Sequence, residues 1–371
     1  MTLPGGIRMI LFGAGFDAEK FIINHKNENI DFIVDDDKKG FLFDIPIIEP
    51  SYLKKINKNH GLIVVTANKY KYYDIRKQLI EWGFIEFKDF IKDDLYQKKI
   101  AMIWGNCHVE YIKEYLKYNT DFNKIYSFYD MREIWVIKKE DISRDIFSYC
   151  DLLIYQPIQK FNMFGEEFSS DHIISLLPET AHKISVPNLF GLPKFLYMQY
   201  DKNKLTKIDN VFVSYGDKNI DSWIKAGISI ETMIKKIEFD EIYKDYEIHE
   251  AFNKFKKKLV HREKEWDIKI SDYILYNYKK IKLFLDPFHP SKILLNEISK
   301  RLLKYMKFTT EDYDINYEDY GFEMIVYPCV KKHLGIVYDD SDIKNDNQSS
   351  KLKKSYMDLK EYIREYVELN S

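Results

Sequence analysis

The feature that most constrains the fold occurs twice: a short apolar segment enters a glycine turn, and a helical pattern follows directly. The first passage covers residues 8–24 and the second covers residues 100–116. This order of strand, turn and helix is typical of parallel sheets covered by helices. At 371 residues, the chain is long enough for about two domains. We therefore predict an α/β fold with two doubly wound parallel-sheet domains and a C-terminal helical extension.

Charge and cysteine content restrict the classes of function. The 57 Lys and Arg residues nearly balance the 59 Asp and Glu residues, so the net charge of -2 lacks the basic excess of a dedicated nucleic-acid binder. No apolar run reaches the roughly 18 to 20 residues that cross a bilayer, and the first residues have no signal-peptide pattern. Three scattered cysteines predict neither a disulfide framework nor a metal site. We expect a cytoplasmic protein with free thiols, no nucleic-acid partner and no stable membrane insertion.

The first predicted domain, residues 1–95, carries a nucleotide-binding pattern. Its turn reads Gly13-x-Gly15-x-x-Ala18, and Asp35 ends a second predicted strand 20 residues after Gly15. That distance is typical of a glycine turn and the carboxylate that binds a ribose. Gly13, Gly15 and Asp35 are therefore candidate ligand-binding residues, with a nicotinamide dinucleotide as one ligand. The glycines could also serve only a tight turn in a domain that binds nothing. The polar segment 89–99 is expected to be the linker to the next domain.

Residues 7–92 resemble the N-terminal domain of the bacterial sugar O-acetyltransferases of the sialic-acid and bacillosamine type. The resemblance is carried by three short runs, Phe12-Gly-Ala-Gly15, Val34-Asp-Asp36 and Ile45-Pro-Ile47. It implies that the glycine turn binds a nucleotide sugar.

The second predicted domain, residues 99–338, places a cysteine where a parallel sheet exposes its ligand edge. Cys107 follows the predicted strand 100–104 and begins a helix. A helix N-terminus lowers the pKa of a thiol and stabilises an oxyanion, so Cys107 is a candidate nucleophile. The alternative is a small buried residue in a tight turn. Gln156 and Asn188 end two further predicted strands, so their amides are candidates for an oxyanion hole, for substrate contacts or for loop capping.

A candidate base lies near the end of this domain. His289 follows Asp286 by three residues, between a predicted strand at 281–285 and a predicted helix at 292–305. An Asp at this spacing can orient an imidazole and stabilise its protonated form. His289 is therefore the candidate base, with Asp286 as the residue that orients it.

This order of site residues is similar to that of the SGNH (GDSL-type) hydrolase fold. Gly105-Asn-Cys107 takes the place of Gly-Asp-Ser, and Asp286-Pro-Phe-His289 takes the place of Asp-x-x-His. The Gly-x-Asn-Asp block of that group is absent from the sequence. More narrowly, residues 99–306 resemble the WcbI family of capsular polysaccharide biosynthesis. The marks are the opening Gly-Asn-Cys, the run 151–156, Pro187-Asn188 and His289-Pro-Ser291.

The resemblance to the WcbI family implies an acetyltransferase that binds acetyl-CoA and modifies a capsule sugar or polysaccharide precursor. Cys107 would accept the acyl group and His289 would be its base, oriented by Asp286. A direct transfer with His289 as base and no acyl-enzyme is equally consistent with these residues.

Four further residues complete the candidate site. Gln156, Asn188 and the backbone N–H of Cys107 would form the oxyanion hole, and Asn106 would contribute to cofactor binding. Many relatives have Gln where this chain has His108, so His108 would either assist the thiol or only fill the turn.

Two other classes of function stay open. With water as the acceptor, the same site would belong to a carbohydrate esterase or deacetylase. With an inert Cys/His site, the chain would be a non-catalytic module that binds a nucleotide sugar.

The C-terminal segment, residues 339–371, is predicted to be a polar linker followed by a helix. Apolar residues recur there at helical spacing. The helix is expected to pack on the body of the protein or on a second subunit, which leaves a homo-oligomer open.

Overall fold

The computed structural model describes residues 8–56, 61–131, 134, 137–139, 142, 144–208, 211–313, 315, 323–339, 343–344 and 356–370. The chain forms two compact units. The first comprises Met1–Trp104, Thr120–Ile154 and Gln159–Lys183, and the second comprises Gly105–Asn119, Tyr155–Ile158 and Ile184–Ser371. The predicted boundaries near residues 95–99 and 338–339 stay a prediction.

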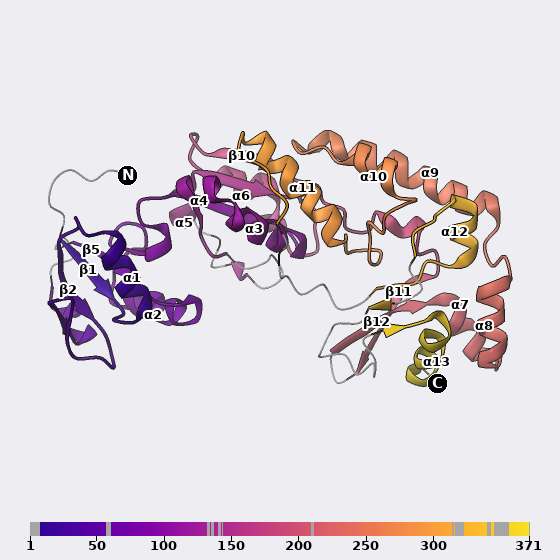
Figure 1. Cartoon of the computed structure of the whole chain (residues 1–371), viewed down its shortest axis with the longest axis horizontal. Helices are drawn as coiled ribbons and strands as arrows, with labels where there is room; N and C mark the ends of the chain where they lie inside the picture. The colour runs from indigo at the N-terminus through magenta and orange to yellow at the C-terminus, as the bar shows by residue number, and fades with distance from the viewer. Residues whose placement is uncertain are drawn as a thin grey trace. The chain divides into compact units, whose positions relative to one another are not determined.

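The first unit begins with a six-stranded sheet in the order β3-β4-β2-β1-β5-β6, part of which is seen in Figure 1. Neighbouring strands are parallel, except that β3 is antiparallel to β4. The strands are β1 (Met9–Phe12), β2 (Ile30–Val34), β3 (Gly40–Leu42), β4 (Ile45–Ile48), β5 (Leu62–Val65) and β6 (Phe90–Lys92). The prediction that residues 89–99 form a linker is therefore wrong at residues 90–92, which form β6. Phe90 is fully buried in the core, and this burial outweighs the polar composition around it.

Helices α1 (Phe16–Asn24) and α2 (Lys69–Glu81) cover opposite faces of this sheet. Successive side chains of β1 point to opposite faces, as in any strand. Phe12 therefore belongs to the core that contains Leu79 of α2, whereas Leu11 belongs to the core that contains Phe21 of α1. The sheet is doubly wound, as the sequence predicted.

A second sheet has the order β10-β9-β7-β8. Its central strand β7 is buried from Ile100 to Trp104, as expected for a parallel strand covered on both faces. The predicted fold class, α/β with two parallel sheets, is confirmed. The strands are β7 (Lys99–Trp104), β8 (Tyr126–Phe128), β9 (Leu152–Tyr155) and β10 (His182–Ser185), with helices α4 (Thr120–Ile125), α5 (Arg144–Phe147) and α6 (Ser170–Leu176) between them.

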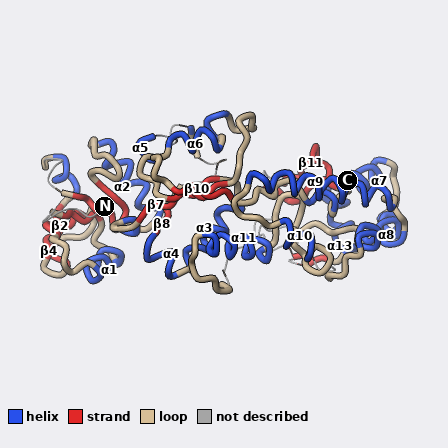
Figure 2. Tube along the Cα trace, turned by 90° about the horizontal axis from the view of Figure 1, so that it is seen from above, coloured by secondary structure: helices blue, strands red, loops and turns tan. Residues whose placement is uncertain are grey.

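In the second unit, α3 (Cys107–Tyr118) and α11 (Lys292–Tyr305) lie side by side, as Figure 2 shows. The hydroxyl of Tyr111 donates to Oδ1 of Asn296 at 2.7 Å and joins the two helices. The sequence predicted both helices. This packing fixes the start of α3, which carries the candidate nucleophile.

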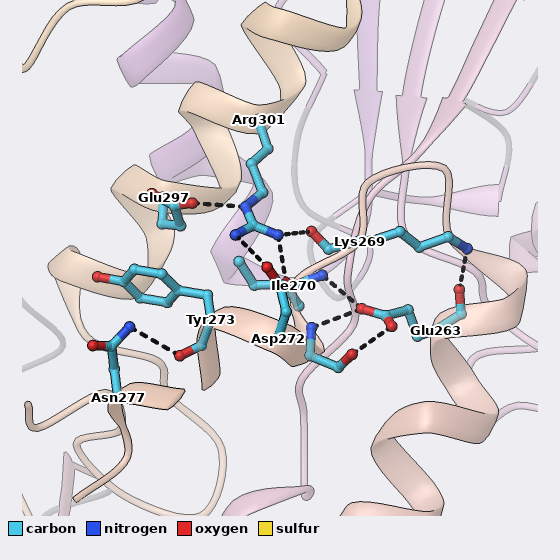
Figure 3. A network of polar contacts seen from close by, with 9 residues as sticks. Glu263, Lys269, Ile270, Asp272, Tyr273, Asn277, Glu297 and Arg301 are labelled. Carbon is cyan, nitrogen blue, oxygen red and sulfur yellow. Dashed lines mark hydrogen bonds and ion pairs between the residues drawn. The ribbon is translucent and has the colours of Figure 1, made fainter. Parts of the chain in front are cut away.

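A polar network fixes the end of α9 (Asp245–Arg262) and the start of α10 (Ser271–Asn277) against α11, as Figure 3 shows. Arg301 of α11 donates to both carboxylate oxygens of Asp272 at 2.6 and 3.0 Å and to the backbone oxygen of Lys269 at 2.8 Å. Glu263, directly after α9, accepts from the backbone N–H of Ile270 at 2.6 Å. The last turn of α9 is therefore held in place.

The remaining elements of the second unit include the C-terminal helix. The predicted helix is confirmed as α13, which packs on α7 and α8. Residues 340–342 and 345–355 of the predicted polar linker lie outside the described residues. The elements are β11 (Tyr200–Ile208), β12 (Val211–Asp217), α7 (Lys218–Lys225), α8 (Ile230–Phe239), α12 (Pro328–Leu334), β13 (Ile343–Lys344), β14 (Tyr356–Met357) and α13 (Leu359–Asn370).

The strand predicted at 281–285 is wrong. The segment forms only an isolated bridge between Phe284 and Pro290. Its backbone instead folds back on itself, because Leu285 N–H donates to His289 O and Ser291 N–H donates to Leu283 O, both at 2.9 Å. Leu283, Phe284 and Leu285 are buried, as in a strand, but in place of a strand ladder the segment makes these two bonds within the loop and accepts single bonds from Tyr197 and Met324.

Candidate functional site

The turn before α3 is built to present Cys107. Asn106 is the N-cap of the helix, and its Oδ1 accepts from the backbone N–H of His108 at 3.1 Å. A Cβ at Gly105 would lie 2.6 Å from Gln156 Oε1 and 2.6 Å from Val109 Cγ1. Close packing therefore requires Gly105 and capping favours Asn106, and together they place the thiol of Cys107 at the first position of the helix.

Gln156 joins this turn to the next loop. Its side chain is fully buried after β9. Oε1 accepts from the backbone N–H of Asn106 at 2.9 Å, and Nε2 donates to the backbone oxygen of Pro187 at 3.0 Å. The amide thus has a partner at each end, and these two bonds fix its orientation between the turn and the loop.

Asp286 and His289 form a pair within the loop that precedes α11. Nδ1 of His289 lies 2.6 Å from Oδ2 of Asp286. The other oxygen of Asp286 accepts from the backbone N–H groups of Phe288 at 2.6 Å and His289 at 2.9 Å. The carboxylate is almost completely buried, whereas 18% of the His289 side chain is exposed. The loop therefore fixes the imidazole and leaves part of it accessible.

Two imidazoles face the half-buried thiol of Cys107. Burial alone would raise the pKa of Cys107, but the imidazoles of His108 and His289 beside the thiol lower it below its ordinary value. Burial alone would lower the pKa of His289, but hydrogen bonds with Asp286 and Cys107 raise it well above its ordinary value. The two shifts favour a thiolate and an imidazolium, which is the reactive form of a cysteine nucleophile.

His108 has one nitrogen engaged and one without a partner. Its Nε2 lies 2.9 Å from the backbone oxygen of Phe288, and a carbonyl can only accept, so Nε2 carries a hydrogen. Nδ1 is buried and makes no hydrogen bond with any described residue. The ring is 99% buried, and its centroid lies 6.2 Å from that of His289.

Asn188 is used differently from the other predicted residues. Its Oδ1 accepts from the backbone N–H of Phe190 at 3.2 Å and so caps a turn. Within the described part of the chain, no hydrogen bond joins its side chain to Cys107 or His289. The structure therefore brings Cys107, His108 and His289 together and gives Asn188 a structural partner.

The predicted ligand residues of the first unit line a separate pocket of about 770 Å³. Gly13 has a φ of +108°, and a Cβ there would lie 2.5 Å from Thr66 O, so the turn requires glycine. Gly15 has a φ of -88°, and a Cβ there would meet no described atom within 4 Å. Neither backbone conformation nor packing explains the second glycine.

Asp35 organises this turn. Its carboxylate accepts from the backbone N–H groups of Ala14 at 2.7 Å, Asp37 at 3.0 Å and Lys38 at 2.8 Å. Burial raises the pKa of Asp35, but these hydrogen bonds and the charge of Lys38 hold it below its ordinary value. Because the carboxylate already holds three N–H groups, its capacity to bind a ribose as well is reduced.

The sequence did not indicate the backbone acceptors of the site. The backbone carbonyls of Pro187 and Phe288 fix Gln156 and His108. Every residue has a backbone carbonyl, so the residue types in the sequence could not reveal these two acceptors.

Within the described ranges, no group of three or more His, Cys, Asp or Glu residues is arranged to hold a metal ion. No described helix combines the length and apolar character that would cross a membrane.

The site described above is a Cys–His–Asp arrangement that follows a parallel strand of an α/β fold, and the family match agrees with this class of protein. Residues 100–311 match the family model described as polysaccharide biosynthesis enzyme WcbI. The match covers more than half of the chain, which therefore belongs to the WcbI family of polysaccharide biosynthesis enzymes. The resemblances to SGNH hydrolases and to the N-terminal domain of sugar O-acetyltransferases stay predictions.

A solved structure of WcbI, a polysaccharide biosynthesis enzyme, is similar to this chain. It is the native protein without a disulfide bond between coenzyme A and one of its cysteines. The TM-score is 0.61 at 20% sequence identity, and the match covers 74% of this chain and 90% of the other. At this identity the likeness shows a shared fold. No curated protein sequence matches the chain.

Proposed function

We propose that this protein transfers an acyl group, in the first instance acetyl, from acyl-CoA to a sugar hydroxyl in the synthesis of a capsular or surface polysaccharide. The observation that carries the proposal is the contact between Cys107, the first residue of α3, and His289. The buried carboxylate of Asp286 fixes the imidazole of His289 in that position. Membership of a polysaccharide biosynthesis family supports a sugar acceptor. The coenzyme A named for the similar structure supports the donor.

The first half-reaction follows from the charge state of the pair. The thiolate of Cys107 attacks the carbonyl carbon of the thioester, and the backbone N–H of Cys107 at the start of α3 stabilises the oxyanion. When the intermediate collapses, the carbon–sulfur bond to CoA breaks, and the leaving thiolate takes the proton of the His289 imidazolium. Cys107 is now a thioester, and His289 is neutral.

The second half-reaction uses the base formed in the first. Neutral His289 removes the proton of the sugar hydroxyl while the oxygen attacks the acyl carbon on Cys107. The carbon–sulfur bond breaks and returns the thiolate beside an imidazolium. Asp286 favours that cation and fixes which nitrogen of the ring faces the reacting atoms.

The test is release of free CoA from acetyl-CoA in the presence of sugar acceptors, followed with a thiol reagent. Without an acceptor, wild type should release at most the one equivalent of CoA that accompanies acylation of Cys107. Continuous release should require an acceptor, and Cys107→Ala should show neither. Equal release by Cys107→Ala and loss in His289→Gln would support direct transfer without an acyl-enzyme. Hydrolysis of a sugar ester without CoA would support the esterase alternative.

We also propose that the pocket of the first unit binds a nucleotide, either a nucleotide sugar or a dinucleotide. Gly15 supports this, because a residue without a structural need for glycine lines a pocket at the start of α1. The carboxylate of Asp35 already accepts from three backbone N–H groups, which leaves it less able to bind the ribose of a dinucleotide. This favours a nucleotide sugar as the ligand. Binding of either ligand to the full chain, measured by calorimetry, tests the proposal.

A further inference from the structure

We infer that three cations, Lys194, Lys258 and Arg262, form a binding site for the phosphate groups of the acyl-CoA donor. We call these residues the cationic cluster. The inference rests on the proposed function and adds to it the part of the protein that recognises the donor.

The fold places the cationic cluster on one surface. Lys258 and Arg262 are four residues apart on α9, so they share a helix face. The short helix η5 (Pro193–Phe195) packs on that face, because the rings of Phe195 and Phe255 stack with centroids 4.3 Å apart. Lys194 of η5 is thereby brought next to the two cations of α9.

Two of the three cations of the cluster have no carboxylate partner in the part of the chain that the structure describes. Among the described residues, neither Lys194 nor Lys258 forms an ion pair, and Lys194 lies over the ring of Tyr200 at 5.3 Å. Burial lowers the pKa of Lys258, and the positive charges of Arg262 and Lys194 lower it further. Burial lowers the pKa of Arg262 as well, although the negative charge of Glu265 opposes this shift. A bound anion would relieve this mutual repulsion.

Arg262 is oriented for recognition. Its Nη1 donates to the backbone oxygens of Asn188 and Phe190, each at 3.2 Å. Its Nε and Nη2 groups have no acceptor among the described residues. A guanidinium held through one nitrogen, with the others available, suits two-point binding of a phosphate.

The cluster is connected to the reaction centre through one loop. The N–H of Gly191 donates to the backbone oxygen of Pro287 at 3.0 Å, and the rings of Phe190 and Phe288 lie 4.5 Å apart. Phe288 directly precedes His289, and 48% of Phe190 is exposed. In coenzyme A, the pantetheine arm separates the phosphates from the thioester. The exposed ring of Phe190 gives that arm an apolar surface between the two sites.

The experiment compares coenzyme A with pantetheine, which has the same thiol arm but no phosphates. Binding of each to the full chain is measured by calorimetry for wild type and for the double variant Lys194→Gln/Lys258→Gln. The variant Lys257→Gln is the matched control, since it removes an exposed charge from the adjacent position of α9. Thermal unfolding of each variant reports whether the fold is kept.

The double variant should bind coenzyme A about tenfold or more weakly, because charged hydrogen bonds are lost, while its affinity for pantetheine stays unchanged. The control should match wild type. Unchanged affinity for coenzyme A, or equal loss for both ligands, would overturn the inference. A nucleotide sugar that loses affinity in the double variant while coenzyme A does not would also overturn it.

Failure of the inference and failure of the proposed function give different results. Acylation of Cys107 by acetyl-pantetheine and by acetyl-CoA with equal efficiency would leave the transfer reaction standing and overturn the phosphate site. A wild-type protein that neither binds coenzyme A nor becomes acylated by either donor would contradict both.

Discussion

Asp286 and His289 make a hydrogen bond of 2.6 Å between Oδ2 and Nδ1, and both residues belong to the four-residue loop between Leu285 and Pro290. The same carboxylate holds two backbone N–H groups of the loop. The orientation of the imidazole is therefore set by the loop itself, before any substrate binds. The account of the site depends on this pair.

Replacing Asp286 with Asn should slow acylation of Cys107 by a factor of about 10² to 10⁴. The amide has no charge to stabilise the imidazolium, and its NH₂ group faces the N–H of the ring. Intact-protein mass spectrometry of samples quenched at successive times gives the rate. Asp272→Asn, which alters an exposed carboxylate paired with Arg301, should stay close to wild type. An unchanged rate in Asp286→Asn would contradict the assigned role.

The rate at which iodoacetamide alkylates Cys107 should follow an apparent pKa below the ordinary thiol value of about 8.5. His289 stabilises the thiolate, so reactivity persists at lower pH than for a free thiol and falls only as the pH passes below the depressed pKa. His289→Gln should move the profile upward. Cys150 is the internal control, because burial raises its pKa to about 12 and should keep it unreactive.

His108→Gln should also raise the apparent pKa of Cys107. A Gln side chain can still donate to the carbonyl of Phe288, but it has no imidazole beside the thiol. The pH profile of alkylation therefore separates electrostatic assistance from turn filling. A profile identical to wild type, with unchanged thermal stability, would show that His108 only fills the turn.

Gln156→Ala should lower the free energy of unfolding by about 2 to 4 kcal/mol. The substitution leaves the N–H of Asn106 and the carbonyl of Pro187 without their partner in a buried site. Urea unfolding followed by fluorescence measures the change. Gln156→Glu keeps an acceptor for Asn106 but loses the donor to Pro187. A cost below 0.5 kcal/mol for Gln156→Ala would contradict the bracing role.

Two glycines of the first unit should respond in opposite ways. Gly13→Ala should destabilise the protein, since its φ is +108° and its Cβ would lie 2.5 Å from Thr66 O. Gly15→Val should leave thermal stability nearly unchanged, because the space beside it is open, and should abolish binding of a nucleotide sugar. Retained binding in Gly15→Val would argue that the glycine has no role toward a ligand.

The sequence predicted the elements whose signals are local. The boundaries of α1 and α11 follow from glycine or proline punctuation and helical periodicity. The spacing of Asp286 and His289 likewise indicated a contact made within one loop. The position of Cys107 followed from one strand and one helix that are adjacent in the chain.

Features that depend on distant partners were missed or misread. The segment predicted as a strand at 281–285 is apolar and largely buried, but the loop that follows folds back on it and it joins no sheet. β6 was hidden in a polar segment because one residue, Phe90, provides its burial. The engagement of Gln156 and Asp35 by backbone groups could not be read from residue types, since every residue other than proline offers the same N–H and C=O.

The central claim is that Cys107 accepts the acyl group, and intact-protein mass spectrometry after incubation with acetyl-CoA tests it directly. The account predicts one added acetyl group on wild type and none on Cys107→Ala, with Cys150→Ala still acylated. An acetyl group on Cys107→Ala, or none on a wild-type protein that binds coenzyme A, would contradict it.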